Sequence, residues 1–136
     1  SALVRPGGVY DLRSMAGETE EQWFPRWEFG GDSWQSDQYD RFSPSRFADK
    51  FKTPTLVIAG ERDYRVPAGQ GLQFFSALQN RKVPSRLLLF PGENHWVGKP
   101  LHTRLWYATV LDWLGRYLGG TRPDPKIIDT ATTIAK

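Results

Sequence analysis

The chain has 136 residues, of which 39% are hydrophobic and 24% charged, with a net charge of +3; these values are typical of one globular domain with a real core. Because Lys and Arg are scattered, the charge does not favour nucleic-acid binding, which usually needs a concentrated basic face. The absence of Cys excludes disulfides and thiolate chemistry, and no apolar run of about 18 residues is present to span a membrane.

The first half of the chain is irregular and rich in aromatic residues. Residues 2–4 predict the end of a short strand, and residues 9–15 predict a loop or one helical turn. Pro25 interrupts any long helix across residues 18–29. Residues 40–49 predict a loop with short helical pieces. Long irregular segments in compact domains tend to be functional, so we expect part of the site here.

The second half alternates between strands and helices. The sequence predicts a strand over 55–59, a helix over 68–80, a strand over 86–90 and a helix over 100–118. On the first helix the shared apolar side consists of Leu72, Phe75 and Leu78. On the second it consists of Trp106, Val110, Trp113 and Tyr117, widened by Leu111, Leu114 and Leu118. This order predicts an α/β fold with a parallel sheet and right-handed crossovers.

An acidic and a basic residue follow the two predicted strands. Asp63 lies in the charged loop after the first, and His95 follows the second. Parallel strands present their carboxyl ends at one edge of the sheet, where open α/β folds place their sites. There, Asp63 would orient the imidazole of His95 and stabilise it when it takes a proton, as in a nucleophilic triad. Alternatively, Asp63 only caps the next helix and His95 packs on Trp96. The occurrence of both loops, acid before base, favours the triad.

Five segments together carry a family resemblance: GERDYRVP at 60–67, ENHWV at 93–97 followed by Lys-Pro, WFP at 23–25, WEFGG at 27–31 and the helix over 106–114. The first resembles the acid loop of the prolyl oligopeptidase family of serine peptidases. The others are similar to its bacterial and fungal dipeptidyl-peptidase branch, so the chain resembles a dipeptidyl-peptidase or acylaminoacyl-peptidase-like member of the family. The resemblance covers most of the chain and implies the C-terminal portion of an α/β-hydrolase fold, a mostly parallel sheet with flanking helices.

The nucleophile of that family has no counterpart in this sequence. The family order is Ser, Asp, His, with the Ser in a Gly-x-Ser-x-Gly elbow, and no Ser here lies in such a motif. The oxyanion-hole loop and the upstream propeller of the family are also missing. We therefore interpret residues 1–120 as the C-terminal part of the peptidase domain and residues 121–136 as a tail that is loose or docks elsewhere. By itself the chain is predicted to be inactive.

The resemblance also implies substrate-binding residues. Arg65 matches a residue that holds a substrate main-chain carbonyl, although a surface ion pair or a cover for Tyr64 explains it equally well. Val66 matches a position near the specificity pocket, with plain packing as the alternative. Four further residues are assigned to the pocket wall, again with packing as the alternative: Val9, Leu12, Met15 and Trp23. His102 is expected on the surface of its helix. No metal or phosphate-loop pattern occurs, so no cofactor and no metal is expected.

Three functions stay open at this point. The leading one is a segment of a serine peptidase, a dipeptidyl or oligopeptidase, that supplies Asp63 and His95. The second is a segment of an esterase-type α/β-hydrolase, and the third is a nonenzymatic fragment that assembles through its exposed sheet edge. The expected partners are a peptide substrate and either the remainder of the parent peptidase or a second copy of this chain, with no nucleic acid and no membrane. Periplasmic, secreted and cytoplasmic locations all stay open.

Overall fold

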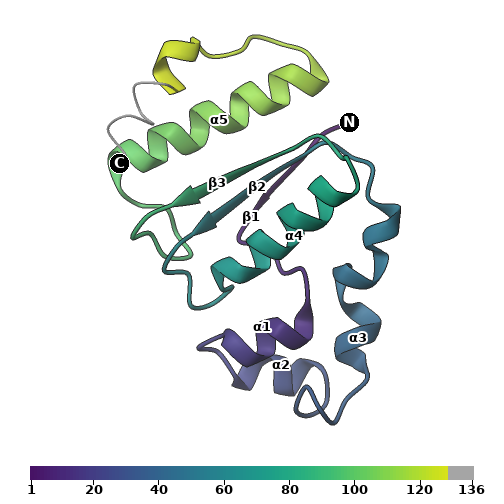
Figure 1. Ribbon diagram of the computed structural model, residues 1–136. Helices are drawn as coiled ribbons and strands as arrows, with labels where there is room; N and C mark the ends of the chain where they lie inside the picture. The colour runs from purple at the N-terminus through teal and green to yellow at the C-terminus, as the bar shows by residue number, and fades with distance from the viewer. Residues whose placement is uncertain (129–136) are drawn as a thin grey trace.

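A three-stranded parallel sheet forms the centre of the computed structural model, which describes residues 1–128 (Figure 1). Its strands are β1 (Leu3–Pro6), β2 (Thr55–Gly60) and β3 (Ser85–Phe90), in the order β1-β2-β3. In the register, Leu3 lies opposite Thr55, and Thr55 lies opposite Ser85. The predicted parallel sheet is therefore confirmed, and β2 is its central strand.

The central strand β2 is buried along its whole length, as expected of a parallel strand covered on both faces. Helix α5 (Pro100–Leu118) lies against one face, and α4 (Ala68–Asn80) lies against the other (Figure 1). Leu56 and Ile58 pack with residues of α5, whereas Val57 packs with residues of α4. This alternation follows from the two-residue period of a strand.

Both long helices have the predicted bounds, but part of each predicted apolar face is wrong. On α4 the buried residues are Gln70, Gly71, Phe74 and Leu78, while Leu72 is exposed. On α5, Val110 and Trp113 are buried as expected, but Leu111 and Leu118 are exposed. The buried stripe of α5 extends instead to His102, Leu105, Thr109 and Asp112. These residues are buried because the sheet and the neighbouring loops pack against the side of each helix on which they lie.

Residues 9–50 form a lobe of short helices on the α4 side of the sheet, away from α5 (Figure 1). The helices are α1 (Leu12–Glu18), α2 (Trp23–Glu28), α3 (Gln38–Phe42) and the 3-10 helix η1 (Pro44–Lys50). The segment predicted as a loop or one turn therefore continues into a two-turn helix, α1. The short helical pieces predicted around Pro44 are confirmed.

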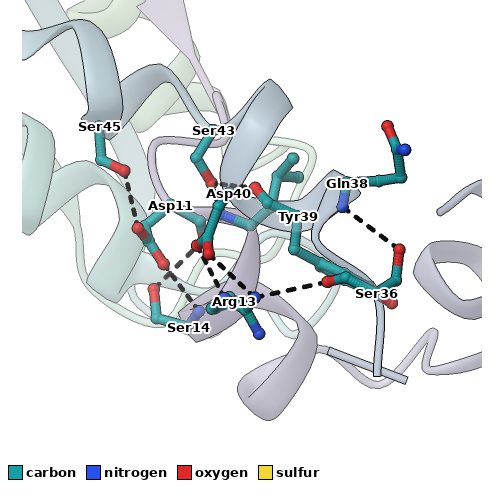
Figure 2. A network of polar contacts seen from close by, with 10 residues as sticks. Asp11, Arg13, Ser14, Ser36, Gln38, Tyr39, Asp40, Ser43 and Ser45 are labelled. Carbon is teal, nitrogen blue, oxygen red and sulfur yellow. Dashed lines mark hydrogen bonds and ion pairs between the residues drawn. The ribbon is translucent and has the colours of Figure 1, made fainter. Parts of the chain in front are cut away.

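Polar side chains hold this lobe together (Figure 2). Asp11 caps α1 by accepting hydrogen bonds from the Ser14 N–H at 2.9 Å and the Ser45 hydroxyl at 2.7 Å. Arg13 donates two hydrogen bonds to the Asp40 carboxylate, at 2.7 and 2.9 Å. This pairing lowers the pKa of Asp40 through the hydrogen bond. Apart from the Ser14 contact, these hydrogen bonds join residues 27 and 34 positions apart, so α1 depends on the folded lobe.

The segment after α5 returns to the helix. Arg122 donates to the Asp112 carboxylate at 2.7 Å, and Ile128 is buried in the core cluster that contains Trp113. The tail thus docks on α5 as far as residue 128, and residues 129–136 of the predicted tail lie outside the described residues. Within residues 1–128, no helix is both long and apolar enough to cross a membrane.

Candidate active site

Asp63 and His95 meet at the carboxyl edge of the sheet. Asp63 follows the end of β2, and His95 lies in the loop after β3. The Asp63 Oδ2 atom lies 2.8 Å from the His95 Nδ1 atom, which is hydrogen-bond distance. The contact predicted from the two loops is confirmed, because neighbouring parallel strands end side by side and bring both loops to one place.

The surroundings of Asp63 fix the direction of its carboxylate. Asp63 is 3% exposed, and its Oδ1 atom accepts hydrogen bonds from the N–H groups of Arg65 at 3.1 Å and Val66 at 2.9 Å. This leaves Oδ2 for His95. Since an ionised carboxylate only accepts hydrogen bonds, His95 donates from Nδ1, and its neutral ring then has an unprotonated Nε2. Asp63 therefore both closes its own loop and orients the imidazole.

Main-chain hydrogen bonds join the acid loop to the histidine loop. The Arg62 N–H donates to the Glu93 carbonyl at 2.8 Å, and the Glu61 N–H donates to the Phe90 carbonyl at 3.0 Å. Gly60 allows this approach, since a Cβ atom there would lie 2.2 Å from the Asn94 carbonyl oxygen. The position of His95 relative to Asp63 is thus set by the backbone of both loops.

Gly7, the residue directly after β1, lies against the imidazole of His95. Its φ is +51°, and a Cβ atom at this position would lie 2.9 Å from the His95 Cε1 atom and 3.3 Å from Nδ1. Nothing in the sequence marked Gly7 as a residue of the site. No sequence pattern points to contact with His95, because the contact depends on the pairing of β1 with β2.

Two hollows meet at His95. One has a volume of about 370 Å³ and is lined by Gly7, Asp63, His95 and several apolar side chains, including Val97 and Trp106. The other, of about 450 Å³, is lined by charged residues of the acid loop and by the histidine loop. The Trp96 ring lies 5.5 Å from the His95 ring in an edge-on arrangement and is 74% exposed. The imidazole therefore stands between an apolar and a polar hollow.

Arg65 lines the polar hollow together with His95. Its guanidinium also forms an ion pair with Glu21 at 3.1 Å, which is the surface role given as an alternative. Val66 is half-buried beside it and contributes its N–H to Asp63. A substrate-binding role for either residue stays a prediction.

The remaining candidate residues lie in the helical lobe. Leu12 and Met15 are buried with Tyr39, and Val9 packs at the edge of the same cluster. Trp23 is 66% exposed and lines a separate surface hollow with Arg26 and Trp27. Neither hollow at His95 includes any of the predicted pocket-wall residues, Val9, Leu12, Met15 and Trp23, within the described part of the chain. The structure thus supports packing for the first three, and their contact with substrate stays a prediction.

The sequence predicted that His102 lies on the surface of its helix. This prediction is wrong, because the residue is buried and only 7% exposed. Its Nδ1 atom lies 2.6 Å from Oε1 of Glu93, which is also buried. Burial alone would raise the pKa of Glu93, but hydrogen bonds from Gly98, His102 and Lys99 outweigh it and hold the pKa below its usual range. Helical spacing could not reveal this pair, because Glu93 lies in the preceding loop.

Residues 1–121 match the model described as "Prolyl oligopeptidase family". The chain belongs to the prolyl oligopeptidase family. The resemblance noted in five segments of the sequence is therefore confirmed over nearly the whole chain.

Relatives within the family include bacterial and fungal proteins. The chain is 41% identical to dipeptidyl-peptidase 5 of Porphyromonas endodontalis over 87% of its own length and 18% of that protein. It is 42% identical to dipeptidyl-peptidase 5 of Aspergillus fumigatus over 98% of its length and 19% of that protein. The chain thus spans about a fifth of the length of these relatives.

A solved structure shares the fold. A puromycin-hydrolyzing peptidase of Mycobacterium tuberculosis has a TM-score of 0.79 and 28% identity, with 90% of this chain and 19% of that one covered. The parallel sheet with flanking helices is accordingly a portion of an α/β-hydrolase fold, as the sequence predicted.

Proposed function

We propose that this chain is a segment of a serine peptidase of the dipeptidyl- or oligopeptidase type, and that it supplies the Asp and the His of a Ser-Asp-His triad. The longer peptidase, called the parent enzyme below, would supply the nucleophilic Ser, since no Ser of this chain lies in a nucleophile elbow. The relatives named as dipeptidyl-peptidases support release of dipeptides from a peptide substrate.

In the proposed reaction, His95 acts as general base. Its Nε2 atom takes the proton of the Ser hydroxyl as the Ser oxygen attacks the scissile carbonyl. The resulting imidazolium is stabilised by the Asp63 carboxylate at Nδ1, and it then gives the proton to the leaving amine. Water repeats the cycle on the acyl-enzyme with the same proton transfers. Asp63 keeps its negative charge throughout.

The observation that carries the proposal is the 2.8 Å contact between the buried Asp63 carboxylate and a His95 ring that is still partly exposed. Asp63 uses its other oxygen for two backbone N–H groups, so its direction is fixed before substrate binds. Within residues 1–128 no hydrogen bond occupies Nε2 of His95. A histidine held at one nitrogen and open at the other suits a general base.

The test is turnover by the parent enzyme and its His95→Ala variant. The parent should hydrolyse a fluorogenic dipeptide faster than a short-chain ester, and His95→Ala should lower kcat by several orders of magnitude, because triad members act as a unit. Arg104→Ala, at an exposed residue of α5, is the matched control and should keep parental rates. Preference for the ester would favour the esterase alternative, and full activity of His95→Ala would overturn the proposed function.

A further inference from the structure

Glu93 is a buried carboxylate for which the proposed reaction has no use. It is 5% exposed and lies two residues before His95. A buried charge is costly unless hydrogen bonds satisfy it. Glu93 is satisfied by three donors: the Gly98 N–H at 3.1 Å, the Lys99 N–H at 3.0 Å and Nδ1 of His102 at 2.6 Å. Because an ionised carboxylate only accepts, His102 donates from Nδ1 here.

These contacts close the histidine loop on itself. Glu93 precedes His95 and Gly98 follows it, so the Glu93 side chain spans the loop and draws its two ends together. Lys99 occupies the N-cap position of α5 and His102 lies in the first turn of that helix, so the same carboxylate fixes the loop to α5. A negative charge is favourable at that helix end. Thr103 adds one further link, from its hydroxyl to the Val97 carbonyl at 3.2 Å.

The backbone of Glu93 faces the acid loop. Its carbonyl accepts the Arg62 N–H at 2.8 Å, one residue before Asp63. One residue therefore connects the acid loop, the histidine loop and the start of α5. His95 lies between these fixed points, and Trp96 beside it is largely exposed, so packing contributes little to holding the tip of the loop.

We propose that Glu93, held by His102, is a positioning residue for His95: it keeps the histidine loop in a conformation in which the imidazole contacts Asp63 and presents Nε2 to substrate. This inference rests on the proposed function, because it assigns a role relative to the general base. It gives His102, which the reaction does not touch, a defined task in the site. Loss of the Glu93 charge would let His95 shift, and shifts of about 1 Å at a reacting group can cost roughly 10²-fold in rate.

The chain offers a matched pair of variants at His102. In His102→Asn the side-chain N–H can occupy the place of Nδ1 and still donate to Glu93, whereas His102→Ala leaves the buried carboxylate without that donor. In the parent enzyme, we expect His102→Ala and Glu93→Gln to lower kcat by about 10- to 100-fold with little change in KM. His102→Asn should restore most of the loss, and Arg104→Ala should have no effect.

Two measurements separate positioning from a general loss of folding. First, kcat is calculated per active site, with sites counted by exhaustive labelling with a fluorophosphonate. Second, the Nδ1 proton of His95 is observed by NMR in parent enzyme labelled with ¹⁵N-histidine. Its signal should be broadened or shifted in Glu93→Gln and His102→Ala. In His102→Asn the signal should match that of the parent enzyme. Parental kcat per labelled site in both damaging variants, or equal rates for His102→Ala and His102→Asn, would overturn the inference.

The His95→Ala variant distinguishes failure of the inference from failure of the proposed function. If His95→Ala is inactive while Glu93→Gln and His102→Ala turn over at parental rates per site, only the positioning role is wrong. If His95→Ala is fully active, the triad itself is wrong. Should Glu93→Gln not fold, the His102→Ala and His102→Asn comparison decides the question alone.

Discussion

Gly7 lies against the His95 ring so closely that the space for a side chain is taken by the imidazole. A Cβ atom at Gly7 would lie 2.9 Å from the His95 Cε1 atom, and the φ of Gly7 is +51°. Both facts disfavour any residue with a side chain there, since positive φ is costly for L-residues. Gly7, which directly follows β1, thus limits how far the imidazole can move.

Gly7→Ala in the parent enzyme should therefore lower kcat/KM by about 10- to 100-fold, because the methyl group would push the imidazole away from Asp63. The matched control is Gly17→Ala in α1, where a Cβ would meet no atom within 4 Å. That variant should keep parental activity and gain slightly in stability, since Ala is the better helix former. Equal activity of the two variants in peptide hydrolysis assays would contradict the prediction.

Asp63→Asn should reduce kcat of the parent enzyme by roughly 10³- to 10⁴-fold. The amide can present an N–H to Nδ1 of His95, which favours the wrong imidazole tautomer and removes the charge that stabilises the imidazolium. Steady-state kinetics with a fluorogenic dipeptide measure the effect. Asp49→Asn, at an exposed carboxylate, serves as the control, and a loss of less than tenfold in Asp63→Asn would argue against the triad.

The lowered pKa of Glu93 predicts a pH dependence of stability. Its usual pKa is 4.5, and because the folded protein holds the carboxyl below that value, the unfolded chain takes up the proton first as pH falls. The stabilisation is therefore present above about pH 4.5 and is lost as pH falls through the folded-state pKa. The thermal unfolding temperature of the parent should fall less on acidification in Glu93→Gln than in the wild type. An unchanged pH profile in Glu93→Gln would refute this, and Glu28→Gln is the exposed control.

The 136-residue chain alone should neither hydrolyse peptides nor react with a fluorophosphonate probe. The probe needs an activated Ser, and Asp63 and His95 have no elbow Ser to act on in this sequence. Mass spectrometry of the chain after incubation with the probe gives a direct reading, with the parent enzyme as positive control. Stoichiometric labelling of the short chain would reveal a nucleophile that the sequence motif does not identify.

The isolated chain should also associate through its sheet edge. Among the described residues, β1 pairs only with β2, and Trp23 and Trp27 are 66% and 78% exposed. An open strand edge and exposed aromatic surface both promote association. We expect β1 to pair with the rest of the parent enzyme or with a second copy, with residues 23–29 in the same interface. Sedimentation at micromolar concentration measures this, and a well-folded monomer would refute it.

The sequence predicted those features that local signals determine. Pro100 and Gly119 mark the ends of α5, and the apolar runs of β2 and β3 end at turns. The Asp63–His95 contact was predictable because the carboxyl ends of adjacent parallel strands meet. The ends of the helices and strands needed only local signals, and the contact needed in addition only the order of strand, helix and strand along the chain.

The missed features depend on contacts between distant segments. Leu72 and Leu111 continue apolar patterns yet face solvent, because a helix buries the side that its neighbours meet. His102 is buried because Glu93 reaches it from the preceding loop. The α1 helix forms with help from Ser45 and from Gln70, whose amide oxygen accepts the Asp11 N–H at 2.8 Å. None of these partners is visible in a local window.

The pairing of β2 with β3 has a consequence for which sequence changes the site can tolerate. Gly60 lies opposite Phe90 in the register, and each strand advances about 3.3 Å per residue. Inserting or deleting one residue in either strand would slide His95 past Asp63 by more than their 2.8 Å contact. Length changes in these strands should therefore abolish activity even where a side-chain change at the exposed position 62 is accepted. Natural selection should therefore preserve the number of residues in β2 and β3 as strictly as it preserves Asp63 and His95.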